Sequence, residues 1–410
     1  MLCETPSLSR RALLGVGGSM AAWAYMPRFA NAADGRDPRL VTIVLRGALD
    51  GLSAVAPIGD PDYEALRASI ALAKTGDNAV QMLDGFFGLH PAMPVLARLY
   101  RANQALVVHA VATNYRERSH FDGQDVLESG QPGPGRVESG WLNRALLALP
   151  KGERVAAGGG LGVGTLSPLV IRGQAPVLGW APQAIQKADG DLAGRVLDLY
   201  RHQDPVLGEA LSKGLDTNRM ASESGMSGDA ARPRGGPDSV EGMKQMAAGT
   251  ARLLARDDGP RLAALAFDGW DTHANEGGAT GRLATLLSGL DAALGIFEQS
   301  MGPAWSQTAI LVVTEFGRTA RINGTVGTDH GTGTVAFLAG GAVKGGRIVT
   351  DWPGLKSANL HENRDLKPTT DLRAVAKGLL ADHLGLSPAV LGSTVFPDSM
   401  GVAPLKGLLG

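Results

Sequence analysis

Residues 40–53 read LVTIVLRGALDGLS, a mainly aliphatic run that gives way to polar and glycine positions at residue 46. Four similar aliphatic or β-branched runs follow along the chain, at 105–111, 262–267, 309–314 and 334–340. Short runs that are apolar throughout are typical of strands buried on both faces of a parallel sheet. The stretch at 40–45 therefore predicts the first strand of such a sheet.

Helical patterns lie between the predicted strands. From Leu283 to Met301 the apolar residues recur at steps of one, three or four, which places them on one face of a helix. Residues 92–103 and 371–385 show shorter patterns of the same kind. Strands that alternate with helices predict an α/β fold, in which helices cover both faces of a mostly parallel central sheet.

The N-terminal residues have the layout of an export signal. A twin-arginine pair, Arg10 and Arg11, precedes a largely apolar stretch at 12–26 and a small-x-small cleavage site at 30–32. A membrane anchor is the alternative, but the apolar stretch is short and rich in glycine and alanine for a span of about 20 residues. We expect residues 1–32 to be a Tat signal peptide, which makes the Tat export machinery a partner and the mature chain periplasmic or otherwise exported.

The composition of the expected mature chain excludes several classes of function. The single cysteine, Cys3, lies inside the predicted signal, so disulfides, thiolate metal ligands and a cysteine nucleophile are excluded. Removing residues 1–32 takes away three arginines and one glutamate, and the remaining 36 basic and 39 acidic residues give a net charge of −3. This charge does not favour nucleic acid or an anionic membrane as a partner. No later segment has the unbroken apolar run of about 18 residues that a membrane span requires.

Residues 216–241 differ in composition from the rest of the chain. They are rich in glycine, serine, proline and charged residues and contain few large apolar ones. This composition predicts a long flexible loop. We interpret the loop as part of one domain, residues 33–410, because the predicted elements on both sides of it fit one sheet. A boundary between two domains is the alternative.

Polar residues cluster at the ends of the predicted strands. In open α/β sheets, ligands bind beyond the carboxyl ends of the strands. Carboxylates and imidazoles there suit a divalent metal such as Zn, Mn, Mg or Ca, and a serine beside them suits a nucleophile. The residues concerned are Asp50, Arg118, Ser119, His120, Asp268, Asp271, His273, Glu315, Arg318, Asp329 and His330.

Several of these positions also have a structural interpretation. The alternatives are a polar turn at Asp50 or at Asp329-His330, a helix cap at Asp271 and His273, and an ion pair between Glu315 and Arg318.

Motifs across nearly all of the expected mature chain resemble the bacterial family called domain of unknown function 1501. The matching stretches are RGALDGLS, LHPAM, RSHFDGQD, GWDTHAN, TEFGRT, GTDHGTG, VKGG with DWPG, and TTDLRAV. That family is similar to the alkaline phosphatase and sulfatase superfamily, whose members place two metals at the strand ends of one three-layer α/β/α domain. The resemblance implies an alkaline-phosphatase-like fold.

The same resemblance implies roles for individual residues. It implies that Ser119 is the nucleophile. Arg118 and His120 flank this serine in the sequence, and in a hydrolase we expect Arg118 or Arg318 to bind anionic oxygens. Where the superfamily has an Asp-His pair after a long strand, this chain has Glu315-Phe316. The missing histidine leaves open whether the site holds two metals, one metal, or a metal that recruits His120. The implied metal site comprises Asp50, Asp271 (or Asp268), His273, Glu315, Asp329 and His330.

Two functions are consistent with these patterns. The first is an exported metal-dependent hydrolase of phosphate or sulfate esters, acting on an anionic small molecule or polymer. The second is a non-catalytic periplasmic binding or assembly protein that keeps the alkaline-phosphatase-like fold, since a fold does not dictate a function.

Overall fold

The computed structural model describes residues 36–410 except 136, 151–154, 156–158, 183–195, 198–199, 201–203 and 222–235. The predicted signal peptide lies outside the described residues. Within the described part of the chain, no helix is both long enough and apolar enough to cross a membrane.

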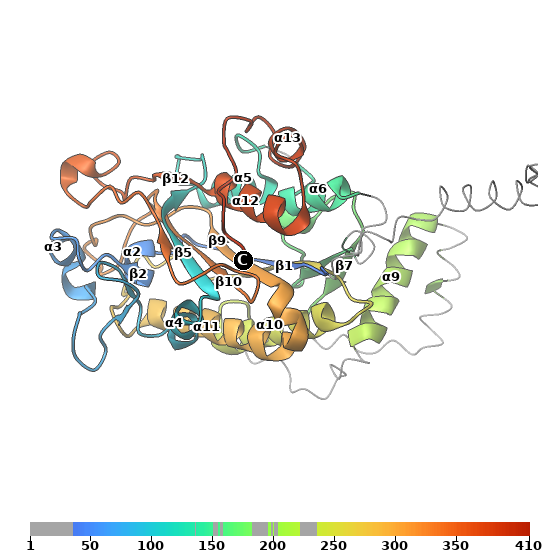
Figure 1. Ribbon diagram of the computed structural model, residues 1–410, viewed down its shortest axis with the longest axis horizontal. Coiled ribbons are helices and arrows are strands. Elements are labelled where there is room, and N and C mark those ends of the chain that lie inside the picture. Colours follow the sequence, from blue (N-terminus) through green and yellow to red (C-terminus); the bar gives the residue numbers. More distant parts are fainter. Residues whose placement is uncertain are drawn as a thin grey trace, which may run out of the picture.

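One sheet of nine strands forms the centre of the described structure (Figure 1). The strand order is β11-β5-β10-β9-β1-β8-β6-β7, and β12 also pairs with β5. The strands are β1 (Arg39–Leu45), β5 (Ala105–Ala112), β6 (Gly160–Val163), β7 (Val177–Trp180), β8 (Leu262–Phe267), β9 (Thr308–Thr314), β10 (Thr334–Ala339), β11 (Ile348–Val349) and β12 (Thr370–Asp371).

The five predicted strands are confirmed as β1, β5, β8, β9 and β10. The mostly parallel character of the sheet is confirmed as well, because β10 alone runs antiparallel to its neighbours β5 and β9 among the described pairings. Its reversed direction brings the start of β10 to the edge of the sheet where β5 and β9 end. Residues that precede β10 therefore meet residues that follow the parallel strands.

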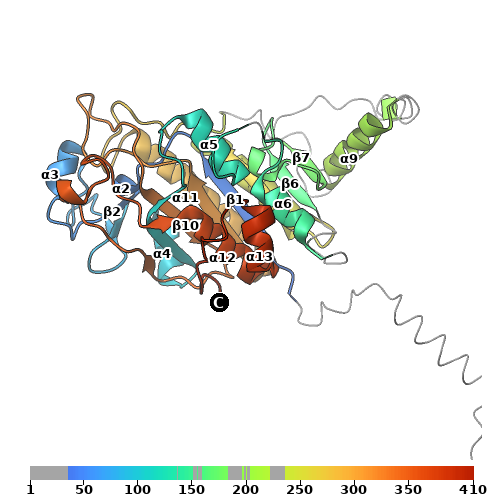
Figure 2. The ribbon, with the colours of Figure 1, turned by 90° about the horizontal axis from the view of Figure 1, so that it is seen from above.

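Helices cover both faces of the sheet, which makes three layers (Figure 1). Side chains of β1 alternate between two cores: Val41 and Ile43 pack with one set of helices, and Leu40 and Val44 pack with the other. The first set is α4 (Pro94–Arg101), α10 (Val240–Ala255) and α11 (Arg282–Met301). The second set is α5 (His120–Ser129), α6 (Trp141–Ala148) and α12 (Leu372–Leu384). The view from above in Figure 2 shows α6, α12 and α13 (Pro388–Val390) over the strands.

Shorter elements complete the described fold. A second sheet of three strands has the order β2-β4-β3. Its strands are β2 (Val55–Ala56), β3 (Gln81–Met82) and β4 (Gly88–Leu89). The remaining helices are α2 (Gly51–Ala54), α3 (Tyr63–Arg67), η2 (Ala68–Ile70), η3 (Leu169–Ile171), α9 (Pro205–Ala221), η5 (Gly302–Gln307), η6 (Ser357–Asn359), α13 (Pro388–Val390) and η7 (Leu391–Val395).

The bounds predicted for the loop at 216–241 are wrong at both ends. Residues 216–221 belong to α9, and residues 240–241 begin α10. Polar residues can extend a helix that has already formed, because each added residue gains one backbone hydrogen bond without a new nucleation step. Helices α9 and α10 therefore extend into the two ends of the predicted loop. Residues 222–235, the middle of the segment, lie outside the described residues. Strands β6 and β7 before the segment and β8 after it belong to the same sheet.

Candidate metal centre

Three connections meet at the edge where the parallel strands end. His120 is the first residue of α5, Asp271 follows β8, and His330 precedes β10. Each of the three offers one ligand atom, and these atoms all lie within 4.8 Å of one another. The reversed direction of β10 explains why a residue ahead of a strand joins residues that follow strands.

The ring of His120 is oriented by Glu315. The Nδ1 atom of His120 lies 2.8 Å from Glu315 Oε1, which can only accept, so Nδ1 carries a proton and Nε2 has the free lone pair when the ring is neutral. This Nε2 atom lies 3.4 Å from Asp271 Oδ2. It is buried and has no hydrogen-bond partner. Buried polar atoms are normally satisfied, so an unpaired imidazole nitrogen aimed at a carboxylate fits a site for a cation.

The ring of His330 is oriented in the same way by a backbone carbonyl. Its Nδ1 atom donates to the carbonyl oxygen of Arg118 at 2.9 Å, so its Nε2 atom also has a free lone pair. That Nε2 atom lies 3.4 Å from Asp271 Oδ1. Arg118 has a left-handed backbone conformation with a φ of 59°, which is uncommon for a residue with a long side chain. In this conformation the carbonyl group of Arg118 points toward the His330 ring and accepts its Nδ1–H.

A third histidine, His273, joins the cluster from the exposed side. Its Nδ1 atom lies 3.1 Å from Asp329 Oδ1, and its Nε2 atom lies 2.9 Å from the Nε2 atom of His330. If both rings are neutral, two lone pairs face each other across this short distance. A shared proton or a bound cation removes the repulsion. We therefore define the candidate metal centre, called the metal centre below, as His120, Asp271 and His330 together with the neighbouring His273.

Asp271 is held at the centre by Arg318. The guanidinium of Arg318 is buried, and its Nη1 atom donates to Asp271 Oδ1 at 2.5 Å. The same guanidinium binds the hydroxyl of Thr328 at 3.2 Å and the carbonyl oxygen of Thr328. Burial acts to raise the pKa of Asp271, but the nearby His120 and His330 rings and the Arg318 guanidinium outweigh it and lower the pKa. The Asp271 and Glu315 carboxylates beside the ring raise the pKa of His120 to about 9, so a cation that binds at Nε2 would displace a proton.

Glu315 lies behind His120 rather than among the converging ligand atoms. It is fully buried, and its Oε1 atom accepts from His120, from the Gly47 N–H at 2.9 Å and from Gln124 at 3.1 Å. Its Oε2 atom accepts from Thr314 at 2.9 Å. This geometry is that of a carboxylate that orients a metal-binding histidine. The predicted alternative of an ion pair between Glu315 and Arg318 is not observed, because Arg318 pairs with Asp271.

Asp50 lies in a different group, which we call the buried carboxylate cluster and define as Asp50, Ser53, Arg67 and Glu276. Asp50 caps α2 by accepting from the Leu52 and Ser53 N–H groups at 3.0 and 3.1 Å, and it pairs with Arg67. The Arg67 guanidinium also lies 3.5 Å from Glu276, and the Ser53 hydroxyl donates to Glu276 at 3.0 Å. The predicted turn at Asp50 is therefore present, in the form of a helix cap.

The Arg118 side chain is not free to bind an anionic substrate, and Ser119 lies beside it at the start of α5. The Arg118 guanidinium pairs with Asp365 at 2.8 Å and with Glu362 at 2.5 Å. Ser119 is the N-cap residue of α5, but its side chain makes no capping hydrogen bond. Its backbone N–H donates to the Tyr115 hydroxyl at 3.3 Å. Ser119 therefore precedes His120 of the metal centre in the sequence, and its hydroxyl does not cap α5.

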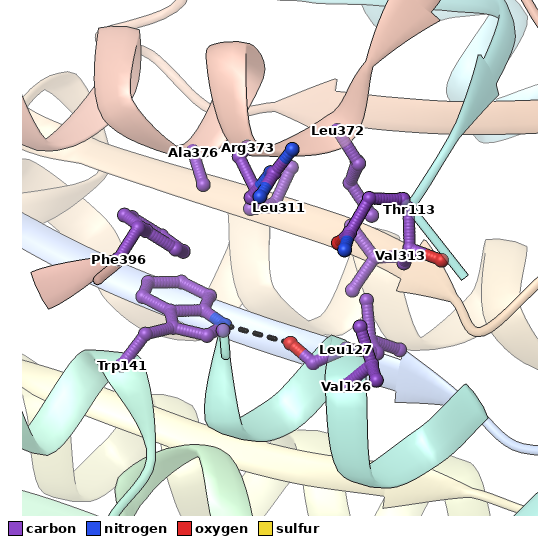
Figure 3. Close-up of a pocket in the computed structure, with 12 residues that line it drawn as sticks. Thr113, Val126, Leu127, Trp141, Leu311, Val313, Leu372, Arg373, Ala376 and Phe396 are labelled. Atoms are coloured by element: carbon purple, nitrogen blue, oxygen red, sulfur yellow. Dashed lines mark hydrogen bonds between the residues drawn. The ribbon is translucent and has the colours of Figure 1, made fainter. Parts of the chain in front are cut away.

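The pocket in Figure 3 is distinct from the metal centre. Its volume is about 20 Å³, room for one water molecule, and its lining is mainly apolar. Trp141 closes one side and donates its indole N–H to the Leu127 carbonyl at 3.1 Å. No residue of the metal centre lines it. This pocket is a packing gap between α5, α6, α12 and β9.

Comparison with known proteins places the chain in a family. The family described as "Protein of unknown function (DUF1501)" matches residues 37–395. The chain belongs to the DUF1501 family. All four residues of the metal centre lie inside the DUF1501 match. No curated protein matches the sequence.

Solved structures resemble the chain only distantly. Ps i-CgsB, solved in complex with k-i-k-neocarrahexaose, has a TM-score of 0.44 and 10% identity, and the match covers 90% of this chain and 77% of that one. Phosphonate monoester hydrolase of Agrobacterium radiobacter has a TM-score of 0.36 and 13% identity, with 90% and 78% covered. Phosphonoacetate hydrolase from Sinorhizobium meliloti 1021 has a TM-score of 0.31 and 12% identity, with 68% and 57% covered. Likenesses this distant do not identify a chemistry, whereas the metal centre is a feature of this chain itself.

Proposed function

We propose that this protein is an exported, metal-dependent hydrolase of phosphate or sulfate esters. The observation that supports the proposal most directly is that the rings of His120 and His330 both point their Nε2 atoms at the Asp271 carboxylate. Both rings donate from Nδ1 to fixed acceptors, and both turn Nε2 toward Asp271. Two imidazole nitrogens and a carboxylate that converge in this way form a ligand set suited to a divalent cation.

The donor set narrows the choice of metal. Mg and Ca prefer oxygen ligands, whereas imidazole nitrogens suit Zn and other first-row transition metals. The metal centre offers nitrogens from His120, His273 and His330 and oxygens from Asp271. We therefore favour Zn or Mn. His120 supplies the histidine that is absent after Thr314, where the chain has Glu315-Phe316.

Ser119 and the start of α5 provide the remaining chemistry. A bound divalent cation supplies Lewis acidity, which neutralises charge that develops on the transferred group. The Ser119 hydroxyl, one residue before His120, is the candidate nucleophile. Because the Ser119 side chain does not cap α5, the first backbone N–H groups of this ten-residue helix remain available to the oxygens of a phosphate or sulfate group.

A second candidate function is a non-catalytic binding or assembly protein. The observation that favours it is the engagement of both nearby arginines by the protein itself. Arg118 pairs with Glu362 and Asp365, and Arg318 pairs with Asp271. Neither guanidinium is therefore held ready for the oxygens of a substrate.

Metal analysis combined with ester hydrolysis distinguishes the two functions. We expect the purified full-length chain to retain about one equivalent of Zn or Mn, and to hydrolyse p-nitrophenyl phosphate or p-nitrophenyl sulfate when that metal is supplied. Bound metal without turnover of either ester favours the binding protein. Protein that retains no metal, and whose Tm does not change when divalent ions are added, contradicts both the metal centre and the hydrolase.

Export is tested separately. The paired Arg10→Lys and Arg11→Lys variant should leave the precursor in the cytoplasm, because the twin arginines are the feature that the Tat machinery reads. Accumulation of that variant in the periplasm contradicts the Tat proposal. N-terminal sequencing of the exported protein should begin near Ala33.

A further inference from the structure

A cleft of about 400 Å³ opens beside the metal centre, a size typical of small-molecule sites. Three segments line it: α3, residues 319–329 and residues 355–364. Asp329 belongs both to the lining and to the surroundings of the metal centre, since its carboxylate accepts from the His273 ring at 3.1 Å. A molecule in the cleft therefore lies next to the metal centre, separated from His273 by Asp329.

The cleft offers donors and acceptors in balanced numbers. Among its lining residues, Arg321 and Arg364 are matched by Asp62 and Asp329, so the formal charge of these four cancels. Asn363 and Ser357 are exposed and add an amide and a hydroxyl. A charge-neutral lining of this kind does not select a polyanion.

The floor of the cleft is aliphatic. Leu66, Leu355 and Leu360 are buried beneath it, and none of the lining residues is aromatic. A flat aromatic ligand would find no ring to stack on. A sugar or another polyol has vicinal hydroxyls, which can hydrogen-bond to the polar side chains of the walls. It also has C–H groups, which can pack against the leucines of the floor.

We propose that this cleft binds the organic part of the ester and that this part is hydroxyl-rich, a sugar or another polyol. The inference rests on the proposed hydrolase function and adds the class of substrate to it. The phosphate or sulfate group lies at the metal centre, and the alcohol part extends past Asp329 into the cleft.

The test fills the cleft and compares two esters. Ser357→Trp places a large ring in the lining from the first residue of η6. The ratio of kcat/KM for glucose 6-phosphate to kcat/KM for p-nitrophenyl phosphate should fall by about tenfold or more, because the lost contacts involve only the sugar. The matched control is Ser306→Trp, an exposed serine in η5 at the opposite edge of the sheet, which should leave the ratio unchanged.

Two results overturn the inference. One is a ratio in Ser357→Trp equal to that of the wild type, when a normal Tm shows that the variant has folded. The other is a wild-type enzyme whose kcat/KM for glucose 6-phosphate does not exceed that for methyl phosphate, an alkyl ester that has no polyol.

Failure of the hydrolase proposal is recognised separately. If neither ester is hydrolysed, calorimetry on the metal-loaded protein compares the binding of glucose 6-phosphate with that of inorganic phosphate. Tighter binding of the sugar phosphate that disappears in Ser357→Trp and persists in Ser306→Trp supports the cleft as a sugar site. Equal binding of the two ligands by the wild type contradicts it.

Discussion

The metal centre and the buried carboxylate cluster are linked through Thr328, yet they use their polar atoms in opposite ways. The Thr328 hydroxyl donates to Glu276 at 2.7 Å, and the Thr328 carbonyl accepts from Arg318, which holds Asp271. In the buried cluster the carboxylates are occupied by protein donors. At the metal centre the Nε2 atom of His120 has no hydrogen-bond partner.

The difference shows why an acidic residue at a strand end is not by itself a metal ligand. Asp50 follows β1 as Asp271 follows β8, but the Asp50 oxygens accept from two backbone N–H groups and from Arg67. A ligand needs a lone pair that the fold has left unused and a neighbour that fixes its direction. His120 meets both conditions, with Glu315 as the neighbour. The comparison predicts that substitutions at the metal centre abolish activity or metal binding. Substitutions in the buried carboxylate cluster should instead lower the stability of the fold.

The largest expected effect concerns chemistry at the metal centre. Ser119→Ala should lower kcat for ester hydrolysis by about a millionfold, the scale observed when a serine nucleophile is removed. The metal content should stay at the wild-type level, because a nucleophile is not needed to hold the ion. The checks are steady-state kinetics and elemental analysis of the same preparation. Hydrolysis that survives in Ser119→Ala would show that Ser119 is not the nucleophile.

The next effect concerns stability in the buried carboxylate cluster. Arg67→Met should lower the free energy of unfolding by about 3–5 kcal/mol, because it leaves Asp50 and Glu276 buried without their cation. Urea unfolding followed by circular dichroism measures the change. The control is Arg98→Met, which breaks the more exposed pair with Glu298 and should cost less than about 1 kcal/mol. Equal losses in the two variants would remove the distinction between the two regions.

A smaller effect is expected on metal affinity. His330→Ala should weaken metal binding by about a hundredfold or more, since it removes one of the converging nitrogens. His383→Ala is the control, because His383 is buried on α12 and its Nε2 atom contacts the carbonyl of Arg39, at the opposite end of β1. Competition with a metal-sensitive chelator gives both affinities. If the two variants retain metal equally well, the ion lies elsewhere.

Glu315→Gln tests whether orientation matters as well as ligation. The amide can still contact His120 but loses the charge that favours the Nδ1–H tautomer, so metal affinity should fall by about 10- to 100-fold. The same chelator competition measures it. Complete loss of metal, as severe as in His330→Ala or more so, would instead indicate that Glu315 is itself a ligand.

The smallest effect is a pH dependence in the buried carboxylate cluster. Burial, together with the Asp50 carboxylate, raises the pKa of Glu276 above its ordinary value of 4.5. A carboxyl whose pKa rises on folding stabilises the protein below its unfolded pKa, and this stabilisation is lost as the pH rises through the folded pKa. Glu276→Gln should therefore compare more favourably with the wild type at pH 8 than at pH 5 in urea unfolding. Parallel stability curves for the two proteins would contradict the shift.

The sequence was sufficient to predict the central strands but not all of the sheet. Runs such as 262–267 are apolar throughout because both faces of β8 are covered, and this pattern is visible without a structure. Strands β6 (GLGV) and β7 (VLGW) were missed because they have four residues each and contain glycine. The antiparallel direction of β10 was also beyond the sequence, since a buried strand has the same composition in either direction.

The candidate site was predictable in its residues more than in their contacts. His330, Asp271 and His273 stand beside apolar runs on short polar loops, and this placement is readable from the sequence. Ser119 and Asp122 match a helix-capping pattern that marks the start of α5, but the convergence of His120 with the other residues depends on tertiary contacts that the local sequence does not show. The buried partners Arg67 and Glu276 were missed because nothing in their local sequence distinguishes a buried charge from an exposed one.

The antiparallel strand has a consequence for how the protein is made. β10 pairs with β5 at Thr334 and Val111, positions 223 residues apart, and it also pairs with β9 on its other side. A nascent chain that ends before β10 would leave β5 and β9 with unpaired edges and without His330 in place. Closing so long a loop is slow, which extends the time for which those edges are exposed. The ability to bind metal should therefore emerge late in synthesis, and chains truncated before residue 334 should aggregate rather than bind the ion.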